Sequence, residues 1–297
     1  MLNILKGNQD TLKVTLDRAQ GNYFPGETVQ ATVYVEPAKE LKIQEGRIVL
    51  ICRESFQYRT IEHTRDSKGH TSAHTVERWM HYEHEAAREP FLMEGTLAAN
   101  VVQTHQFAAK IPENSWPSLD GRIVKVQWLV KATLDRKLTG DVNTEAVVNV
   151  LSAMSEAQTQ GSYGQSSEPG EAMLSLELPG TNFLPGELIS GNLLITAQKK
   201  FDANEVRVEL AQAEYVSFDQ GNHNENTFKV KLAGKTKFNP GETLRLPFQV
   251  QLPNPCPVSA AGNTWWAGWK LRGVLNRFLR KDTMVEQELK VYSVRKS

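Results

Sequence analysis

Cysteine is scarce in this chain, with only Cys52 and Cys256, which lie far apart and outside any Cys-x-x-Cys motif. This scarcity excludes the disulfide-rich scaffolds of small secreted proteins and makes a reducing compartment, the cytoplasm, the expected location. Long apolar runs are missing as well, and none approaches the roughly 20 residues that span a membrane. The sequence does not open on a basic segment followed by an apolar one, so we expect no export signal.

Neither sign of charge dominates, because lysine and arginine together number 34, as do aspartate and glutamate. This balance argues against a nucleic-acid-binding protein that neutralises phosphates. Motifs of catalysis are also missing, since there is no GxSxG, HExxH, P-loop or GxGxxG. Cys52 ends the apolar segment Ile48–Cys52, and Cys256 has no visible base beside it, so neither is expected to be a nucleophile. We therefore predict no enzymatic activity and no cofactor.

The chain does contain an internal repeat. The segment Asn22–Glu27 recurs as Asn182–Glu187, and Trp128–Arg136 recurs as Trp269–Arg277. Two shorter matches lie between these segments in the same order in both halves. The repeat predicts two similar domains, for which 297 residues are sufficient at about 150 residues a domain.

Composition suggests where the two domains meet. Residues 155–171 are polar and rich in Gly, Ser and Gln, which is typical of a flexible linker. We place the first domain at residues 1–154 and the second at residues 172–297. The second domain has an excess of basic residues, whereas the first is close to neutral.

Apolar and polar residues alternate with a period of two in both halves, which predicts β-strands rather than helices. In the repeated tryptophan segment one face is apolar in both copies, as a strand half-buried in a sandwich requires. These inward positions are Val124, Val126, Trp128, Val130 and Ala132 in the first copy and Trp265, Ala267, Trp269, Leu271 and Gly273 in the second. Other predicted strands are Leu12–Leu16, Thr28–Val35, Arg47–Arg53, Ala146–Leu151, Leu174–Leu178, Leu188–Thr196, Val206–Ala211, Phe228–Leu232, Leu244–Leu252 and Val285–Tyr292. We predict an all-β fold of two tandem antiparallel β-sandwich domains of immunoglobulin-like type.

A Pro-Gly-Glu tripeptide occurs three times between predicted strands. The copies are Pro25-Gly26-Glu27, Pro185-Gly186-Glu187 and Pro240-Gly241-Glu242. Proline fixes φ at the first corner of a type II turn, and glycine supplies the positive φ of the second corner. We predict a type II turn at each copy.

Taken in order along the chain, these features resemble the arrestin fold. Phe24–Glu27 and Trp128–Ala132 resemble the arrestin N-domain, whereas Phe183–Glu187, Phe238–Glu242 and Trp269–Arg277 resemble the C-domain. The chain is most similar in style to arrestin-domain (α-arrestin) proteins and to bacterial sporulation-control arrestin-like proteins. The resemblance covers nearly the whole chain and implies a non-enzymatic intracellular adaptor or scaffold whose partners bind sheet edges, loops and concave faces.

Some features of the visual and β-arrestins and of the α-arrestins have no counterpart here. There is no Pro-Pro dipeptide, so no PPxY motif is present to recruit WW-domain ubiquitin ligases. The buried charge cluster that latches visual and β-arrestins cannot be assigned to residues of this sequence. Lys13, in the first predicted strand, matches the place where those arrestins sense phosphate, and the resemblance makes it a candidate partner contact.

The second copy of the tryptophan strand suggests a binding surface. Trp266 falls on the face opposite Trp265 and Trp269, and an outward indole is typical of a docking contact, unless it packs under a loop or at a domain interface. A basic strip continues along this segment and consists of Lys270, Arg272, Arg277, Arg280 and Lys281. Together with Trp266 the strip suits phosphorylated segments or anionic headgroups. The simpler interpretation is a solvated sheet face kept charged against aggregation.

Histidines gather in the first half of the chain. The pairs His70/His74 and His81/His84 have spacings that metal sites use. Residues four apart on a strand, however, lie about 13 Å from each other, and the segment is typical of an exposed hairpin. These four histidines are secondary candidates for a metal site, and we predict no bound metal.

Three functions remain open at this point. The leading hypothesis is an intracellular adaptor or scaffold that binds a protein or peptide partner, by β-strand addition at a sheet edge and by clamping in the concavity between the domains. The second is a peripheral module on an anionic membrane surface that uses Trp266 and the basic strip, an attachment that salt would weaken. The third is a metal-binding β-sandwich built on the His-rich hairpin. The sequence defines neither the partner nor the oligomeric state.

Overall fold

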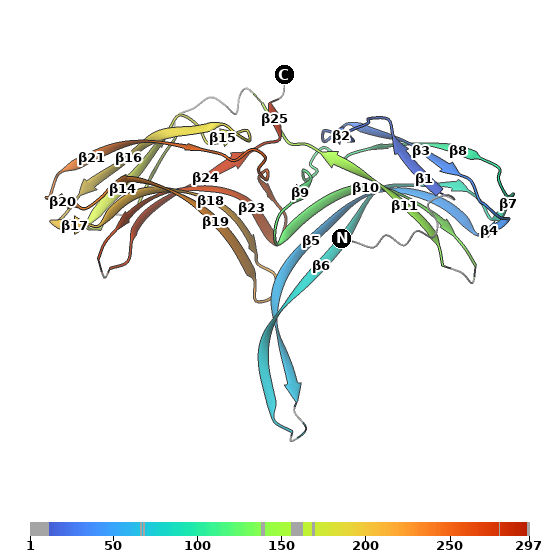
Figure 1. The fold of residues 1–297 in the computed structure, drawn as a ribbon, viewed down its shortest axis with the longest axis horizontal. Coiled ribbons are helices and arrows are strands. Elements are labelled where there is room, and N and C mark those ends of the chain that lie inside the picture. The colour runs from blue at the N-terminus through green and yellow to red at the C-terminus, as the bar shows by residue number, and fades with distance from the viewer. Residues whose placement is uncertain are drawn as a thin grey trace. The chain divides into compact units, whose positions relative to one another are not determined.

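The computed structural model describes residues 12–295 except 66, 68, 138–139, 156–162, 168–169 and 279. The described residues form β-strands and connecting loops and contain no helix (Figure 1). The chain divides into two compact units. Unit 1 comprises the residues up to Phe56, Trp79–Asp120 and Lys125–Leu151, and unit 2 comprises Gln57–Arg78, Gly121–Val124 and the residues from Ser152 onwards.

Twelve strands lie before residue 155 and thirteen after it. The first twelve are β1 (Leu12–Leu16), β2 (Asn22–Tyr23), β3 (Thr28–Val35), β4 (Leu41–Ile43), β5 (Glu45–Arg65), β6 (Thr71–Leu92), β7 (Gly95–Leu97), β8 (Gln103–Lys110), β9 (Leu119–Asp120), β10 (Val124–Asp135), β11 (Val142–Val150) and β12 (Ala153–Met154). The others are β13 (Tyr163–Ser166), β14 (Ala172–Leu178), β15 (Asn182–Phe183), β16 (Leu188–Ala197), β17 (Phe201–Ala203), β18 (Glu205–Val216), β19 (Asn222–Ala233), β20 (Thr236–Phe238), β21 (Thr243–Gln251), β22 (Ala260–Ala261), β23 (Trp265–Asn276), β24 (Thr283–Val291) and β25 (Val294–Arg295).

Unit 1 is built on two sheets. One has the strand order β1-β3-β8, and the other has the order β2-β11-β10-β5-β6, with β9 added at β10. The inward side chains are buried, among them Val33 of β3, Phe107 of β8 and Trp128 of β10. Alternation of buried and exposed residues along each strand brings the apolar faces of both sheets into one core, which makes unit 1 a β-sandwich.

Unit 2 repeats this architecture. Its main sheets have the orders β13-β14-β16-β21 and β15-β24-β23-β18-β19, with β22 added at β23. One hydrophobic cluster takes side chains from both sheets, including Leu174 of β14, Leu193 of β16 and Trp269 of β23. The residues Gln57–Arg78 of the β5–β6 hairpin and the turn Gly121–Val124 are grouped with this unit.

The duplication extends to the strand registers. Trp128 pairs with Val148 in β10–β11, and Trp269 pairs with Leu289 at the equivalent place in β23–β24. The short strands β2 and β15 each run parallel to their neighbours β11 and β24. Every strand predicted from alternation overlaps a strand of the structure. The predicted all-β fold of two antiparallel sandwiches is confirmed.

The segment predicted as a linker, residues 155–171, is partly a strand. Tyr163–Ser166 form β13, which pairs antiparallel with β14 from Tyr163↔Leu178 to Ser166↔Ser175. Backbone hydrogen bonds alone satisfy such an edge strand, so polar composition does not prevent it from joining a sheet. Four residues of the segment predicted as a flexible linker thus belong to a sheet, and the predicted domain bounds stay a prediction. Residues 156–162 and 168–169 lie outside the described residues.

Each Pro-Gly-Glu copy forms the predicted type of turn. The glycines have φ of 86°, 79° and 85° at Gly26, Gly186 and Gly241. The backbone N–H of the glutamate donates to the carbonyl oxygen three residues earlier, at 3.1 Å in every copy. The glutamate carboxylate, a partner that the sequence analysis missed, accepts the N–H of that same earlier residue at 2.8, 2.8 and 2.7 Å. The glutamate thus closes its turn through both backbone and side chain.

Substituting Gly241→Ala is expected to lower the free energy of unfolding by about 1 kcal/mol, because an L-residue at this positive φ is strained. No heavy atom lies within 4 Å of the position of the added Cβ, so packing does not contribute. Gly140 is the matched control, since its Cβ also meets nothing within 4 Å and its φ lies outside the strained range. Urea denaturation of both variants checks this, and an equal effect at the two positions would contradict the turn assignment.

Candidate partner-binding site

The three tryptophans of β23 lie on two faces of the strand, because side chains alternate along it. Trp265 and Trp269 point into the core of unit 2 and are 3% and 0% exposed, whereas Trp266 is half-buried on the opposite, outer face. The indole N–H of Trp269 donates to the carbonyl oxygen of Pro257 at 2.9 Å, so the buried polar atom is satisfied. The indole N–H of Trp266 instead reaches the carboxylate of Glu288 at 3.3 Å. The predicted inward and outward positions are confirmed.

Trp266 does not stand alone on its face. Tyr215 of β18 lies directly across from it in the strand register, and the two rings are 5.7 Å apart between centroids. The Lys270 ammonium lies over both rings, 4.8 Å from the centre of Tyr215 and 5.5 Å from that of Trp266. These contacts form an aromatic–cation cluster of Tyr215, Trp266 and Lys270. Sequence analysis missed Tyr215, because only the register of β18 against β23 brings it to this place.

A shallow groove of about 640 Å³ in unit 2 runs past this cluster. Its walls are the two aromatic rings, the loops that end β18 and begin β23, and Arg59 of the β5–β6 hairpin. His223 and Asn222 at the start of β19 add polar groups. Arg59 also lies 3.5 Å from Glu77, within the same hairpin. The groove therefore combines an aromatic wall with polar groups that can orient a ligand.

Two cations of the basic strip are neutralised by carboxylates of other strands in the same sheet. Arg272 of β23 contacts Glu225 of β19 and Glu286 of β24, each at 2.6 Å, and Lys270 contacts Glu286 at 2.8 Å. The hydrogen bond from Arg272 lowers the pKa of Glu225. Burial alone would raise the pKa of Glu286, but hydrogen bonds from Lys270 and Arg272 outweigh burial and lower it. These cations form a closed ion-pair network rather than a free positive surface.

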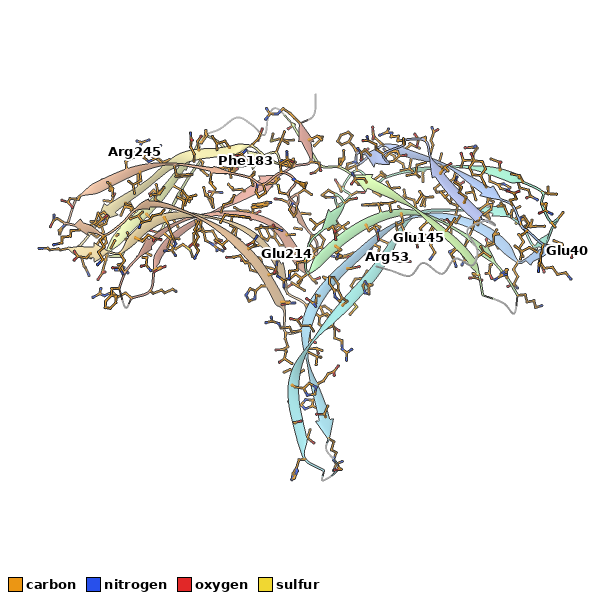
Figure 2. All side chains as sticks on the ribbon, in the orientation of Figure 1. Glu40, Arg53, Glu145, Phe183, Glu214 and Arg245 are labelled. Carbon is orange, nitrogen blue, oxygen red and sulfur yellow. The ribbon has the colours of Figure 1, made fainter. Side chains whose placement is uncertain are left out.

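Unit 1 has a similar network. Arg53 of β5 contacts Glu83 of β6 at 2.8 Å and Glu145 of β11 at 3.2 Å. Arg53 and Glu145 are labelled in Figure 2. In each unit one arginine thus joins glutamates from two strands of the same sheet. One glutamate is on the edge strand, Glu83 of β6 or Glu225 of β19, and the other is on the second strand from the opposite edge, Glu145 of β11 or Glu286 of β24. The carboxylate partners come from distant parts of the sequence, so spacing alone does not reveal them.

The rest of the basic strip lies near the loop between β23 and β24. Arg277 and Arg280 both pair with Glu171, and Arg277 also donates to the backbone carbonyl of Lys281. Lys13 belongs to unit 1, where it is exposed on β1 and lines a separate groove of about 500 Å³ with Tyr34. The predicted partner-binding residues therefore fall into three groups rather than one continuous patch.

The structure does not bring the four candidate histidines together. His81 hydrogen-bonds Ser55 at 2.9 Å, whereas His84 hydrogen-bonds Glu54 at 2.8 Å. Residues 81 and 84 of one strand point to opposite faces, since side chains alternate along β6. His70 precedes β6 and His74 lies within it. No group of three or more His, Cys, Asp and Glu side chains in the described part of the chain could hold a metal ion.

The two cysteines are placed where thiolates are disfavoured. Cys52 is buried in β5, and burial raises the pKa of its thiol to about 12. Cys256 is half-buried against the core of unit 2, and burial raises its pKa to about 11. Since the thiolate is the nucleophile, these raised pKa values disfavour a nucleophilic role for either cysteine.

The fold is that of a duplicated β-sandwich protein, and unit 2 carries an aromatic face beside a groove. Residues 12–156 match the family model of the arrestin (or S-antigen) N-terminal domain, and residues 168–276 match that of the SpoOM protein. The chain belongs to the arrestin-fold proteins, which are generally non-enzymatic and of adaptor type. A search of curated proteins found no significant match. Within the described residues, no helix is long and apolar enough to cross a membrane.

Proposed function

We propose that this chain is a non-enzymatic adaptor that binds a protein or peptide partner in the groove of unit 2 beside Trp266. The observation that carries the proposal is the aromatic pair of Trp266 and Tyr215, half-exposed on a groove wall while the two other tryptophans of β23 are buried. Large amphipathic rings that are rigid and partly exposed are the side chains that dominate binding energy at protein interfaces.

The polar groups of the groove favour an extended segment as ligand. Arg59, Asn222 and His223 line it together with the glycines of two loops, Gly221 and Gly262. Polar side chains such as those of Arg59, Asn222 and His223 can hydrogen-bond the main chain of a peptide. The aromatic wall takes apolar side chains of that segment, and the polar groups fix its direction.

A protein partner is better supported at this face than an anionic membrane. Attachment to anionic lipid needs unpaired basic residues near the surface. Lys270 and Arg272, which share the outer face with Trp266, are instead matched by Glu225 and Glu286. The face is close to neutral, so apolar contact and hydrogen bonding, rather than charge, provide its affinity.

The variant Trp266→Ala is expected to weaken binding of the partner by about 30-fold, the effect of losing a hot-spot aromatic worth about 2 kcal/mol. Affinity capture from native cytosol identifies the partner, and titration of the purified pair measures the loss. The matched control is Phe278→Ala, an aromatic that is 75% exposed in the β23–β24 loop and does not line the groove. A Trp266→Ala protein that folds normally and keeps every partner would refute the proposal.

A further inference from the structure

The last strand of the main sheet of unit 1 has an unpaired edge. β6 follows β5 at the end of the order β2-β11-β10-β5-β6, and no described strand pairs with its other side. Its residues Trp79–Leu92 belong to unit 1. Most of them are exposed, including the large rings of Trp79 and Tyr82 at 39% and 42%. The backbone N–H and C=O groups on such an edge are a template for another strand.

Other edge strands of the described sheets have features that disfavour pairing with a further strand. β1 and β13 are short, β8 has eight residues and ends in Lys110, β21 contains Pro247, and β19 carries Lys229 and Lys231. Short length, proline and lysine are the usual protections of a sheet edge. The segment Trp79–Leu92 has no lysine and no glycine, and its one proline, Pro90, lies near its end. Among the edges of the described sheets it is the longest stretch without lysine or glycine, which favours strand addition there.

The charges on this edge select the strand that it accepts. Glu83, Glu85 and Glu89 lie an even number of positions apart, with Ala87 between the last two, and so project from one face of β6. Glu83 is 2.8 Å from Arg53, and Glu85 is 3.7 Å from Arg88, while no described cation is within ion-pair distance of Glu89. Antiparallel pairing with a second copy would place these glutamates opposite or beside one another, which is destabilising. A strand with basic residues opposite Glu83, Glu85 and Glu89 would instead meet a carboxylate at each of these three positions.

We propose that the free edge of β6 over Trp79–Glu89 binds an extended basic peptide by strand addition. Lysine or arginine opposite Glu83, Glu85 and Glu89 pairs with their carboxylates, and an apolar residue packs on Trp79. The peptide backbone hydrogen-bonds the unpaired groups of β6. This inference rests on the proposed adaptor function and adds a second site with its own ligand chemistry, outside the groove beside Trp266.

The test uses the full chain and two peptides of equal composition, each matching Trp79–Glu89 in length. In one, lysine alternates with threonine and valine, and in the other the lysines are grouped into blocks. Because only the alternating peptide can oppose all three glutamates, we expect it to bind on the order of tenfold more tightly in a fluorescence titration. Amide hydrogen exchange is expected to slow within β6. Equal binding of the two peptides, or protection elsewhere, would overturn the proposal.

Charge reversal identifies the site. The double variant Glu85→Lys and Glu89→Lys is expected to lose the lysine peptide and to bind the same peptide with glutamate in place of lysine. Both glutamates are exposed, so the fold is retained. Glu40→Lys, an exposed position elsewhere in unit 1 that is labelled in Figure 2, makes the same kind of charge change and is expected to leave binding unchanged. An equal loss with Glu40→Lys means that only net charge matters, which contradicts a site on β6.

The proposed groove and the proposed strand-addition site can be tested independently of each other. Trp266→Ala is expected to lose the captured partner but to keep the lysine peptide, because Trp266 lies in unit 2 outside Trp79–Glu89. If no peptide binds while Trp266-dependent capture persists, the strand-addition site is wrong and the adaptor function stands. If the chain forms a dimer that protects the same amides of β6, the occupant of this edge is a second copy, and the peptide proposal is overturned.

Discussion

Substituting Trp269→Ala is expected to lower the free energy of unfolding of unit 2 by about 4 kcal/mol. The side chain is fully buried in β23 and belongs to the cluster that joins the two sheets of unit 2. Its removal leaves a cavity in this hydrophobic cluster. It also leaves the carbonyl oxygen of Pro257, which accepts the indole N–H at 2.9 Å, without that donor. Urea denaturation followed by circular dichroism measures the loss.

Trp269→Phe separates the two contributions to this effect. Phenylalanine refills most of the cavity but cannot donate to Pro257, so we expect a loss of about 2 kcal/mol. Trp266→Ala serves as the surface comparison on the same strand and is expected to cost about 1 kcal/mol or less, because its indole is half-exposed. If Trp269→Ala were no worse than Trp266→Ala, the assignment of inward and outward faces on β23 would be wrong.

The strands and their faces were predictable because alternation is a local property. The inward face of β10, marked by Val124 and Trp128, and that of β23, marked by Trp265 and Trp269, need only the pleat of a strand and an apolar core. The Pro-Gly turns were predictable for the same reason, since a proline φ and a positive glycine φ define the turn within four residues. The repeat then indicated two domains of similar architecture, because each local pattern occurs twice in the same order.

The partners of charged residues were not predictable in this way. Lys270 and Arg272 were grouped in a basic strip, yet both are neutralised by glutamates of other strands. Glu286 comes from the adjacent β24, and Glu225 comes from β19, which lies beyond β18. Their proximity depends on strand order and register, which a single sequence does not encode locally. The same limit explains Tyr215, which meets Trp266 only through the pairing of β18 with β23.

The histidine pairs show the converse case, in which residues close in sequence lie apart in the structure. His81 and His84 are close in sequence, but a strand turns side chains three apart to opposite faces, so sequence proximity does not become a shared site. His81 reaches Ser55, and His84 reaches Glu54. Spacing rules for metal ligands therefore require knowledge of the local secondary structure before they carry weight.

Glu214 of β18 is a buried carboxylate whose three partners are all backbone groups. It is 2% exposed and accepts the N–H groups of Arg122, Ile123 and Val124 at 2.9, 2.7 and 2.9 Å. A Cβ at Gly121 would lie 2.6 Å from its Oε2 atom, so glycine is the residue that allows the carboxylate to approach this turn. All of these residues belong to unit 2 (Glu214 is labelled in Figure 2).

Substituting Glu214→Ala is expected to lower the free energy of unfolding of unit 2 by about 3 kcal/mol, because it leaves the buried N–H groups of Ile123 and Val124 without an acceptor. Glu214→Gln keeps one carbonyl oxygen of the same shape and is expected to cost about 1 kcal/mol, since neutral hydrogen bonds are weaker than charge-assisted ones. Amide exchange of the turn Gly121–Val124 should quicken far more in Glu214→Ala than in Glu214→Gln, whereas exchange in the core strand β16 should follow global stability alone. If exchange of the turn were unchanged in Glu214→Ala, the carboxylate would not be what holds it.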